Sequence, residues 1–334
     1  MTEKYLVIDA HNHYLPKEAT RLACKADGFD YVASLKRVPV GYENTFDIER
    51  RVRLMDEAGV DIAVLEQSSW SPQGLEMCKA MNDGYAEAVR RYPDRFIPCA
   101  HLPLEPGQEV LDEFERAYNE LGFRGLSLVS STSDYTLDSE ELFPIYEKAG
   151  QLDIPIAVHP SIKKGIWGGA KYGLSDHASR EYDVTKATVE VMYGVLSRFP
   201  DLKFLMPHHG GGIPAVKGRI LAWHEPERWD VPPNLKGMPK TPRELAELGL
   251  DEDFENLFGK IYFDLAGFGG WMPVTEAAVK TIRRDRLCFG TDYPFEIHEA
   301  QDVKSFIDNI KTLEIPEQDK RNILGENIKR LFKV

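Results

Sequence analysis

Short apolar segments rich in β-branched residues alternate with longer segments of helical periodicity along almost all of this 334-residue chain. Strands that alternate with helices pack into a parallel sheet joined by right-handed crossovers. The predicted strands are residues 7–13, 61–66, 96–101, 123–129, 154–159, 203–207, 261–265 and 286–289. Because a helix is predicted after each of the eight, the pattern favours an α/β fold that closes into a (β/α)8 TIM barrel over an open doubly wound sheet.

Two segments interrupt this alternation. Residues 14–46, after the first strand, show no clear periodicity, and residues 225–259, before the seventh strand, contain five prolines. Proline removes a backbone hydrogen bond from a helix interior, so we interpret the second segment as a lid or a subunit contact. Helices from residues 298 and 316 complete a predicted single domain, residues 1–334, which we expect to form a homodimer or homotetramer.

Composition narrows the possible partners and compartments. Asp and Glu outnumber Lys and Arg by 54 to 41 and no basic block occurs, so nucleic acid and anionic membranes are not expected partners. The four cysteines are widely spaced, which is typical of reduced thiols in a cytoplasmic protein. The sequence shows no signal peptide and no run of about 18 apolar residues, so we predict neither secretion nor a membrane span.

Polar residues stand at the C-terminal ends of four predicted strands. His11 and His13 end the first, and side chains two residues apart in a strand point to the same face. His159 ends the fifth strand, His208 and His209 follow the sixth, and Asp292 follows the eighth. A single histidine at a strand end is more often structural. Because these strand ends share one face of a barrel, their combination predicts a metal site there.

These motifs resemble those of a known family. Asp-x-His-x-His at residues 9–13, His159, His-Gly-Gly-Gly at 209–212 and Gly-Thr-Asp-Tyr-Pro-Phe at 290–295 resemble the amidohydrolase superfamily, in particular the branch of the aminocarboxymuconate semialdehyde decarboxylases and hydroxybenzoate decarboxylases. The resemblance runs nearly end to end. It implies one divalent ion held by His11, His13, His159 and Asp292, catalysis by His209, and a substrate carboxylate held by Arg51 and Arg219. His208 and residues 67–70 depart from the expected pattern.

The fourth strand bears on the number of ions. Two-metal members of the superfamily use a bridging ligand there, usually a carboxylated lysine, whereas residues 125–131 contain no lysine. We therefore expect a single ion. Three imidazoles and one carboxylate suit Zn²⁺ or Mn²⁺ and leave a coordination position open. Asp9 is interpreted as a carboxylate that orients an imidazole rather than as a direct ligand.

The mouth of the barrel is predicted to accept a flat acid. Trp167 and Phe295, together with Trp70, Phe268 and Trp271, follow strand ends, although core packing is the alternative for each. Arg51 and Arg219 suit bidentate contact with a carboxylate, but each could equally be a helix-surface arginine.

We predict a metal-dependent, non-oxidative decarboxylase of a hydroxybenzoate-like aromatic or conjugated carboxylic acid, in which His209 and Asp292 handle protons. Hydrolysis of a lactone or amide, or hydration of a related acid, would use the same ligands and is the alternative. A barrel kept only as a non-catalytic scaffold is disfavoured, because every ligand position is filled.

Overall fold

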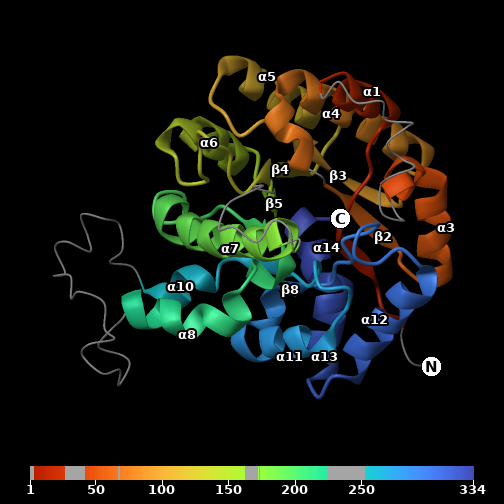
Figure 1. Ribbon diagram of the computed structural model, residues 1–334, viewed down its shortest axis with the longest axis vertical. Helices are drawn as coiled ribbons and strands as arrows, with labels where there is room; N and C mark the ends of the chain where they lie inside the picture. The colour runs from red at the N-terminus through yellow and green to blue at the C-terminus, as the bar shows by residue number, and fades with distance from the viewer. Residues whose placement is uncertain (1–3, 27–41, 67, 162–171, 173, 225–252) are drawn as a thin grey trace.

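The computed structural model describes residues 4–26, 42–66, 68–161, 172, 174–224 and 253–334 (Figure 1). Eight parallel strands form one sheet, in which each strand pairs with its neighbours in chain order. The strands are β1 (Ile8–Asn12), β2 (Ile62–Leu65), β3 (Phe96–His101), β4 (Gly125–Val129), β5 (Ile156–His159), β6 (Phe204–Met206), β7 (Tyr262–Asp264) and β8 (Leu287–Cys288).

Contacts between the first and last strands close this sheet. The amide of Ala10 donates to the carbonyl of Phe289 at 2.8 Å, and the amide of Asp292 donates to the carbonyl of His11 at 2.9 Å. A parallel bridge also joins Asn12 to the residue after Asp292. The predicted (β/α)8 barrel is therefore confirmed, and the C-terminal ends of its strands lie at one mouth.

Helices surround the barrel (Figure 1). They are α3 (Ile48–Ala58), α4 (Leu75–Arg91), α5 (Gln108–Asn119), α6 (Phe143–Gln151), α7 (Leu174–Glu190), α8 (Ile213–His224), α11 (Met272–Thr281) and α12 (Ala300–Thr312). Local sequence sets the ends of α3: the Asp47 carboxylate accepts a hydrogen bond from the Arg50 amide, and Gly59 ends the helix at φ +81°. Within the described part of the chain, none of the helices has the length and hydrophobicity needed to cross a membrane.

Three segments qualify the sequence prediction. The stretch 14–46, expected to be irregular, contains α1 (Lys17–Ala26), which contacts α4. Helix α7 begins at Leu174 rather than at residue 183. The sequence pattern did not predict its first turns because they carry little apolar periodicity. Most of the proline-rich segment, residues 225–252, lies outside the described residues, and its described end contains α10 (Phe254–Phe258).

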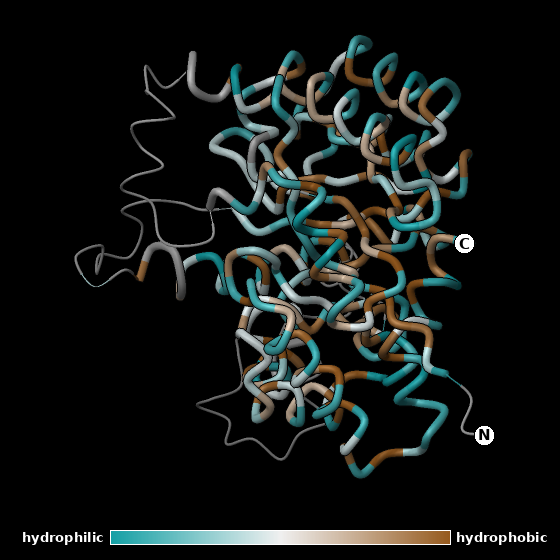
Figure 2. The backbone as a smooth tube through the Cα atoms, turned by 90° about the vertical axis from the view of Figure 1, so that its right-hand side faces the viewer, coloured by the Kyte–Doolittle hydropathy of each residue, from teal (hydrophilic) through white to brown (hydrophobic). Residues whose placement is uncertain are grey.

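Helices α13 (Glu317–Arg321) and α14 (Asn327–Phe332) finish the chain, and α14 covers the N-terminal end of the barrel. Its residues Leu331 and Phe332 join an apolar cluster with strand residues such as Ile8 and Cys99. The Phe332 ring lies so close to Gly125 that a Cβ there would be 2.6 Å from it. A second, larger apolar layer fills the space between the strands and the outer helices. Hydrophobic stretches accordingly cross the middle of the molecule in Figure 2.

Candidate metal centre and active site

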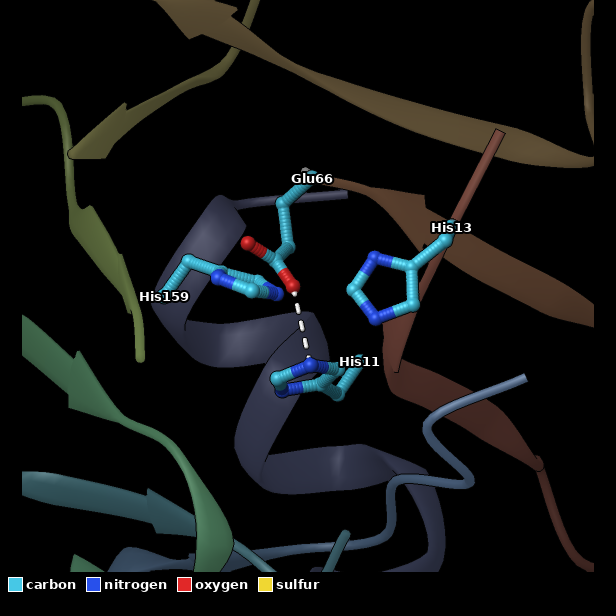
Figure 3. Close-up of side chains that lie close together, drawn as sticks. All are labelled: His11, His13, Glu66 and His159. Atoms are coloured by element: carbon cyan, nitrogen blue, oxygen red, sulfur yellow. Dashed lines mark ion pairs between the residues drawn. The ribbon is translucent and has the colours of Figure 1, made fainter. Parts of the chain in front are cut away.

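Imidazoles and carboxylates from several strands meet at the C-terminal mouth of the barrel. His11 and His13 come from the end of β1, Glu66 follows β2, and His159 ends β5, and all four point toward one another (Figure 3). One ligand atom from each lies within 4.8 Å of those of the others. A second group with the same spacing contains His11, His208 and Asp292. All of these residues are buried.

The unpaired atoms of this cluster test whether the residues fit a metal ion. Buried polar atoms normally have hydrogen-bond partners. Several atoms here have none among the described residues: Nε2 of His11 and His208, Nδ1 of His13, Oε1 of Glu66 and Oδ2 of Asp292. Nε2 of His11 lies only 3.3 Å from Oε1 of Glu66, yet the two atoms do not form a hydrogen bond. Nitrogen and oxygen atoms gathered in this way fit one divalent cation such as Zn²⁺ or Mn²⁺.

Hydrogen bonds on the far side of the ring orient two of the histidines, His11 and His159. Nδ1 of His11 bonds Oδ2 of Asp264 at 2.9 Å, so its Nε2 faces Glu66. Nδ1 of His159 donates to the carbonyl of Pro160 at 2.9 Å, which leaves Nε2 for the cluster. Metal-binding histidines are commonly fixed by a carboxylate or a backbone carbonyl in this way. Asp264 and Glu66 were missed in the sequence, although each stands at a strand end like the residues that were found.

Asp9 anchors the backbone of the site. Its carboxylate accepts hydrogen bonds from the Thr291 amide at 2.9 Å and the Thr291 hydroxyl at 2.7 Å, and it forms an ion pair with Arg51. It therefore ties β1 to the loop that carries Asp292, and none of its hydrogen bonds to the described residues involves an imidazole ring. Arg51 is 1% exposed, and its guanidinium lies over the ring of Tyr293, 4.5 Å from the centroid. Arg51 thus pairs with Asp9 through Nη2, while its buried Nε and Nη1 have no hydrogen-bond partner among the described residues.

The two adjacent histidines after β6 point in different directions. Nδ1 of His208 lies 2.8 Å from Oε1 of Glu181, and its Nε2 lies 3.4 Å from Oδ2 of Asp292. The His209 ring instead packs against Phe268, with centroids 5.3 Å apart, and reaches the Thr275 hydroxyl at 3.5 Å. The sequence prediction selected His209, but the structure brings His208 to the cluster.

The backbone of this turn explains the difference. His208 and His209 both have positive φ, 53° and 59°, so their side chains do not alternate as they would in a strand. Gly211 follows at φ 66°, and a Cβ there would lie 2.1 Å from the carbonyl of Glu181. Packing of the turn on α7 therefore sets which ring faces the mouth, and a sequence motif alone does not report it.

The electrostatics of the cluster favour a bound cation. Burial lowers the pKa of His11, but Glu66, Asp264 and Asp292 outweigh burial and raise it to about 10. Burial likewise lowers the pKa of His208, which the Glu181 and Asp292 carboxylates raise to about 9. Protons on these rings therefore balance carboxylate charge, and a divalent ion would displace protons as it binds.

Burial shifts two neighbours in the direction of their neutral forms. It raises the pKa of Glu66 to about 7 and lowers that of His209 to about 4. Burial therefore holds His209 as a neutral ring, which packs against Phe268.

Arg180 and Glu181, at the mouth end of α7, were not anticipated. Nε of Arg180 donates to Oε1 of Glu181 at 3.0 Å, and its Nη2 donates to Oε1 of Glu296 at 2.9 Å. Nη2 also lies 3.9 Å from Oδ2 of Asp292. No motif marks these two residues, because they lie in the turns of α7 that the periodicity did not predict.

The predicted substrate-binding residues are dispersed. Phe295 is 38% exposed, and its ring lies 5.1 Å from that of His13, so it borders the site. Arg219 is exposed on α8. Trp167 lies outside the described residues.

A model of the amidohydrolase family matches residues 8–334. The chain belongs to this family. The resemblance recognised from the motifs is thereby confirmed.

Two curated relatives match over most of the chain. A 2-amino-3-carboxymuconate-6-semialdehyde decarboxylase from Dictyostelium discoideum is 27% identical, covering 96% of this chain and 90% of its own. A gamma-resorcylate decarboxylase from Polaromonas is also 27% identical, covering 86% and 87%. Among solved structures, a 5-carboxyvanillate decarboxylase from Novosphingobium aromaticivorans, in complex with manganese and a nitrobenzoic acid, superposes with a TM-score of 0.78. It is 22% identical and covers 99% of this chain and 96% of its own, which supports the barrel assignment.

Proposed function

We propose that this amidohydrolase is a metal-dependent, non-oxidative decarboxylase of an aromatic or conjugated carboxylic acid. The observation that carries the proposal is the buried cluster of imidazoles and carboxylates whose unpaired atoms converge at the barrel mouth. The two relatives described above, which match over most of the chain, are decarboxylases of such acids, and this supports decarboxylation over other reactions that the same cluster could support.

In this proposal His11, His13, His159 and Asp292 hold one Zn²⁺ or Mn²⁺, as the sequence suggested, and Glu66 is an additional ligand. Glu66 joins the set because its Oε1 is unpaired and faces His11. The ion, when bound, would orient and polarise an oxygen of the substrate. The ring of Phe295 beside His13 offers an apolar face to a planar substrate.

His208 takes the proton-handling role that the sequence motif assigned to His209. Its ring is held between Glu181 and Asp292, so a proton can be held on Nδ1 or Nε2 and delivered at the mouth. In the reaction a proton adds to the carbon that bears the carboxylate. The bond between this carbon and the carboxylate then breaks, CO₂ leaves, and the electron pair returns to the conjugated system. His209 has a structural role in this proposal, because its ring packs against Phe268.

Carbon balance separates this function from hydrolysis or hydration. The metal-loaded protein is incubated with panels of hydroxybenzoates, conjugated acids and lactones, and products are followed by mass spectrometry. We expect loss of one CO₂ from at least one acid and, with product in excess, incorporation of labelled bicarbonate. Protein stripped of metal is the control and should be inactive. Turnover of lactones with all carbon retained, and no CO₂ from any acid, would assign the chain to the hydrolases.

We further propose that the enzyme acts in the cytoplasm as a homodimer or homotetramer. Cys78, Cys99 and Cys288 are free and buried, in keeping with a reducing compartment. Light scattering of the purified protein tests the assembly, and a monomer at working concentration would exclude it.

A further inference from the structure

We propose that Arg180 binds a carboxylate that the substrate keeps through the reaction, so that the preferred substrates are aromatic or conjugated diacids. One carboxylate leaves as CO₂ and the other stays on Arg180. The inference rests on the proposed decarboxylation and extends it to the class of acid.

Arg180 reaches the cluster from the side of the mouth. Its Nη2 lies 3.9 Å from Oδ2 of Asp292, and its side chain is 15% exposed, so it contacts both the cluster and solvent. An acid seated at the cluster could therefore extend a second carboxylate to this guanidinium. Partial burial weakens screening by water, so the ion pair would be stronger than one on the surface.

The hydrogen bonds of Arg180 leave room for a ligand. A guanidinium carries five N–H groups in a planar fork. Glu181 accepts from Nε and thereby fixes the side chain, while Nη1 makes no hydrogen bond to any residue that the structure describes. Nη2 is bonded to Glu296, whose side chain is 28% exposed on the loop after β8. A substrate carboxylate can bind Nη1 and displace the Glu296 carboxylate from Nη2.

An anionic substrate needs this cation. Carboxylates dominate the mouth, namely those of Glu66, Glu181, Asp264, Asp292 and Glu296. Among the described lysines and arginines, Arg180 alone pairs with Asp292. Of the two arginines predicted for this role, Arg51 is buried and pairs with Asp9, and Arg219 is exposed on α8.

The direction of charge movement indicates which carboxylate Arg180 holds. As the C–C bond breaks, negative charge leaves the departing carboxylate and enters the conjugated system. An ion pair with that carboxylate would stabilise the substrate more than the transition state and so slow the reaction. A retained carboxylate keeps its charge throughout, so pairing with Arg180 improves binding without this cost.

The test compares unreactive acids with one and two carboxylates. Titration calorimetry measures binding of benzoate and of isophthalate to the Mn²⁺-loaded enzyme, so that no turnover is required. We expect the wild type to prefer isophthalate by about 10- to 100-fold, the effect of a hydrogen bond to a charged group. Arg180→Met should abolish this preference by weakening isophthalate alone, and Arg180→Lys should keep part of it. Arg283→Met, at an exposed site before β8, is the matched control and should keep the full preference.

Glu296→Gln gives a test of opposite sign. It removes the charge that competes for Nη2, so isophthalate should bind more tightly while benzoate is unchanged. Equal losses for both acids in Arg180→Met, or a preference that survives it, would overturn the assignment of Arg180. Release of CO₂ is measured separately: an enzyme that prefers isophthalate but decarboxylates no acid would refute the proposed function and leave the Arg180 subsite standing.

Discussion

The two ends of the barrel interior are built from the same strands but from opposite chemistry. At the C-terminal end, imidazoles and carboxylates are buried with several polar atoms unpaired. At the N-terminal end, Ile8 and Cys99 from the strands pack against Leu331 and Phe332 of α14 in an apolar cluster. Helix α14 is held there by Asn327, whose side-chain amide donates to the carbonyls of Arg284 and Leu287 at 2.9 and 2.6 Å.

The fold thus keeps its stabilising apolar contacts and its reactive polar groups at opposite ends of the barrel. Unpaired buried polar atoms cost free energy, so the C-terminal end is stable chiefly when a ligand satisfies them. The apolar end gains free energy from burial and needs no ligand. Mutations at the two ends should therefore affect different measurements, and the following predictions test that separation.

The largest effect is expected from removing a proposed ligand. His11→Ala or Asp292→Ala should lose both bound metal and activity, because each removes one of the five proposed ligands of a single ion. The loss of metal affinity should exceed the roughly 10- to 100-fold that loss of an orienting partner costs. Elemental analysis of dialysed protein measures the metal, and Arg283→Met is the control. If both variants retained a full complement of metal, the assignment of His11 and Asp292 as ligands would be wrong.

His208→Ala and His209→Ala should separate proton handling from support. His208→Ala should keep its metal and lose about 10²- to 10⁴-fold in kcat, the usual share of a general acid or base. His209→Ala should cost less activity, because its ring contacts Phe268 and Thr275 rather than Asp292. Steady-state kinetics measure kcat for the two variants, and elemental analysis measures their bound metal. The reverse order of effects would restore His209 as the proton-handling residue.

Phe332→Ala should act on stability alone. Removing the ring that packs on Gly125 should lower the free energy of unfolding by about 3–5 kcal/mol, as is usual for buried phenylalanines. Phe332→Leu should cost less, since it keeps most of the apolar contact. Denaturant unfolding gives the free energies, and metal content should match the wild type in both folded variants. A folded Phe332→Ala protein without metal would show that the two ends are coupled.

The smallest effect is the stabilisation by the ion itself. Zn²⁺ or Mn²⁺ at about 100 times its dissociation constant should stabilise the protein by about 2.7 kcal/mol. The increment should be the same in Phe332→Ala, because distant sites contribute additively, and absent in Asp292→Ala. Thermal unfolding with and without metal measures it. An increment that shrank in Phe332→Ala would argue against independent ends.

Much of this architecture follows from sequence pattern. The regular alternation of apolar and helical segments predicts the barrel, because crossover helices force parallel strands and eight strands can close. That inference also brings His11, His13, His159 and Asp292 to one mouth, since residues at the C-terminal ends of parallel strands share an edge. The structure places His11, His13 and His159 in one group of potential ligands and His11 and Asp292 in a second, although His11 and Asp292 are 281 residues apart (292 − 11).

Other features were decided only by tertiary packing. His208 rather than His209 faces Asp292 because a turn of positive φ packs on α7, and adjacent positions in such a turn follow no simple periodicity. Arg180 meets Glu296 through contact between α7 and the loop after β8, two segments that no local propensity relates. Sequence pattern predicts periodic elements and their shared edges, whereas the direction of a side chain in a turn depends on contacts with residues distant in the chain.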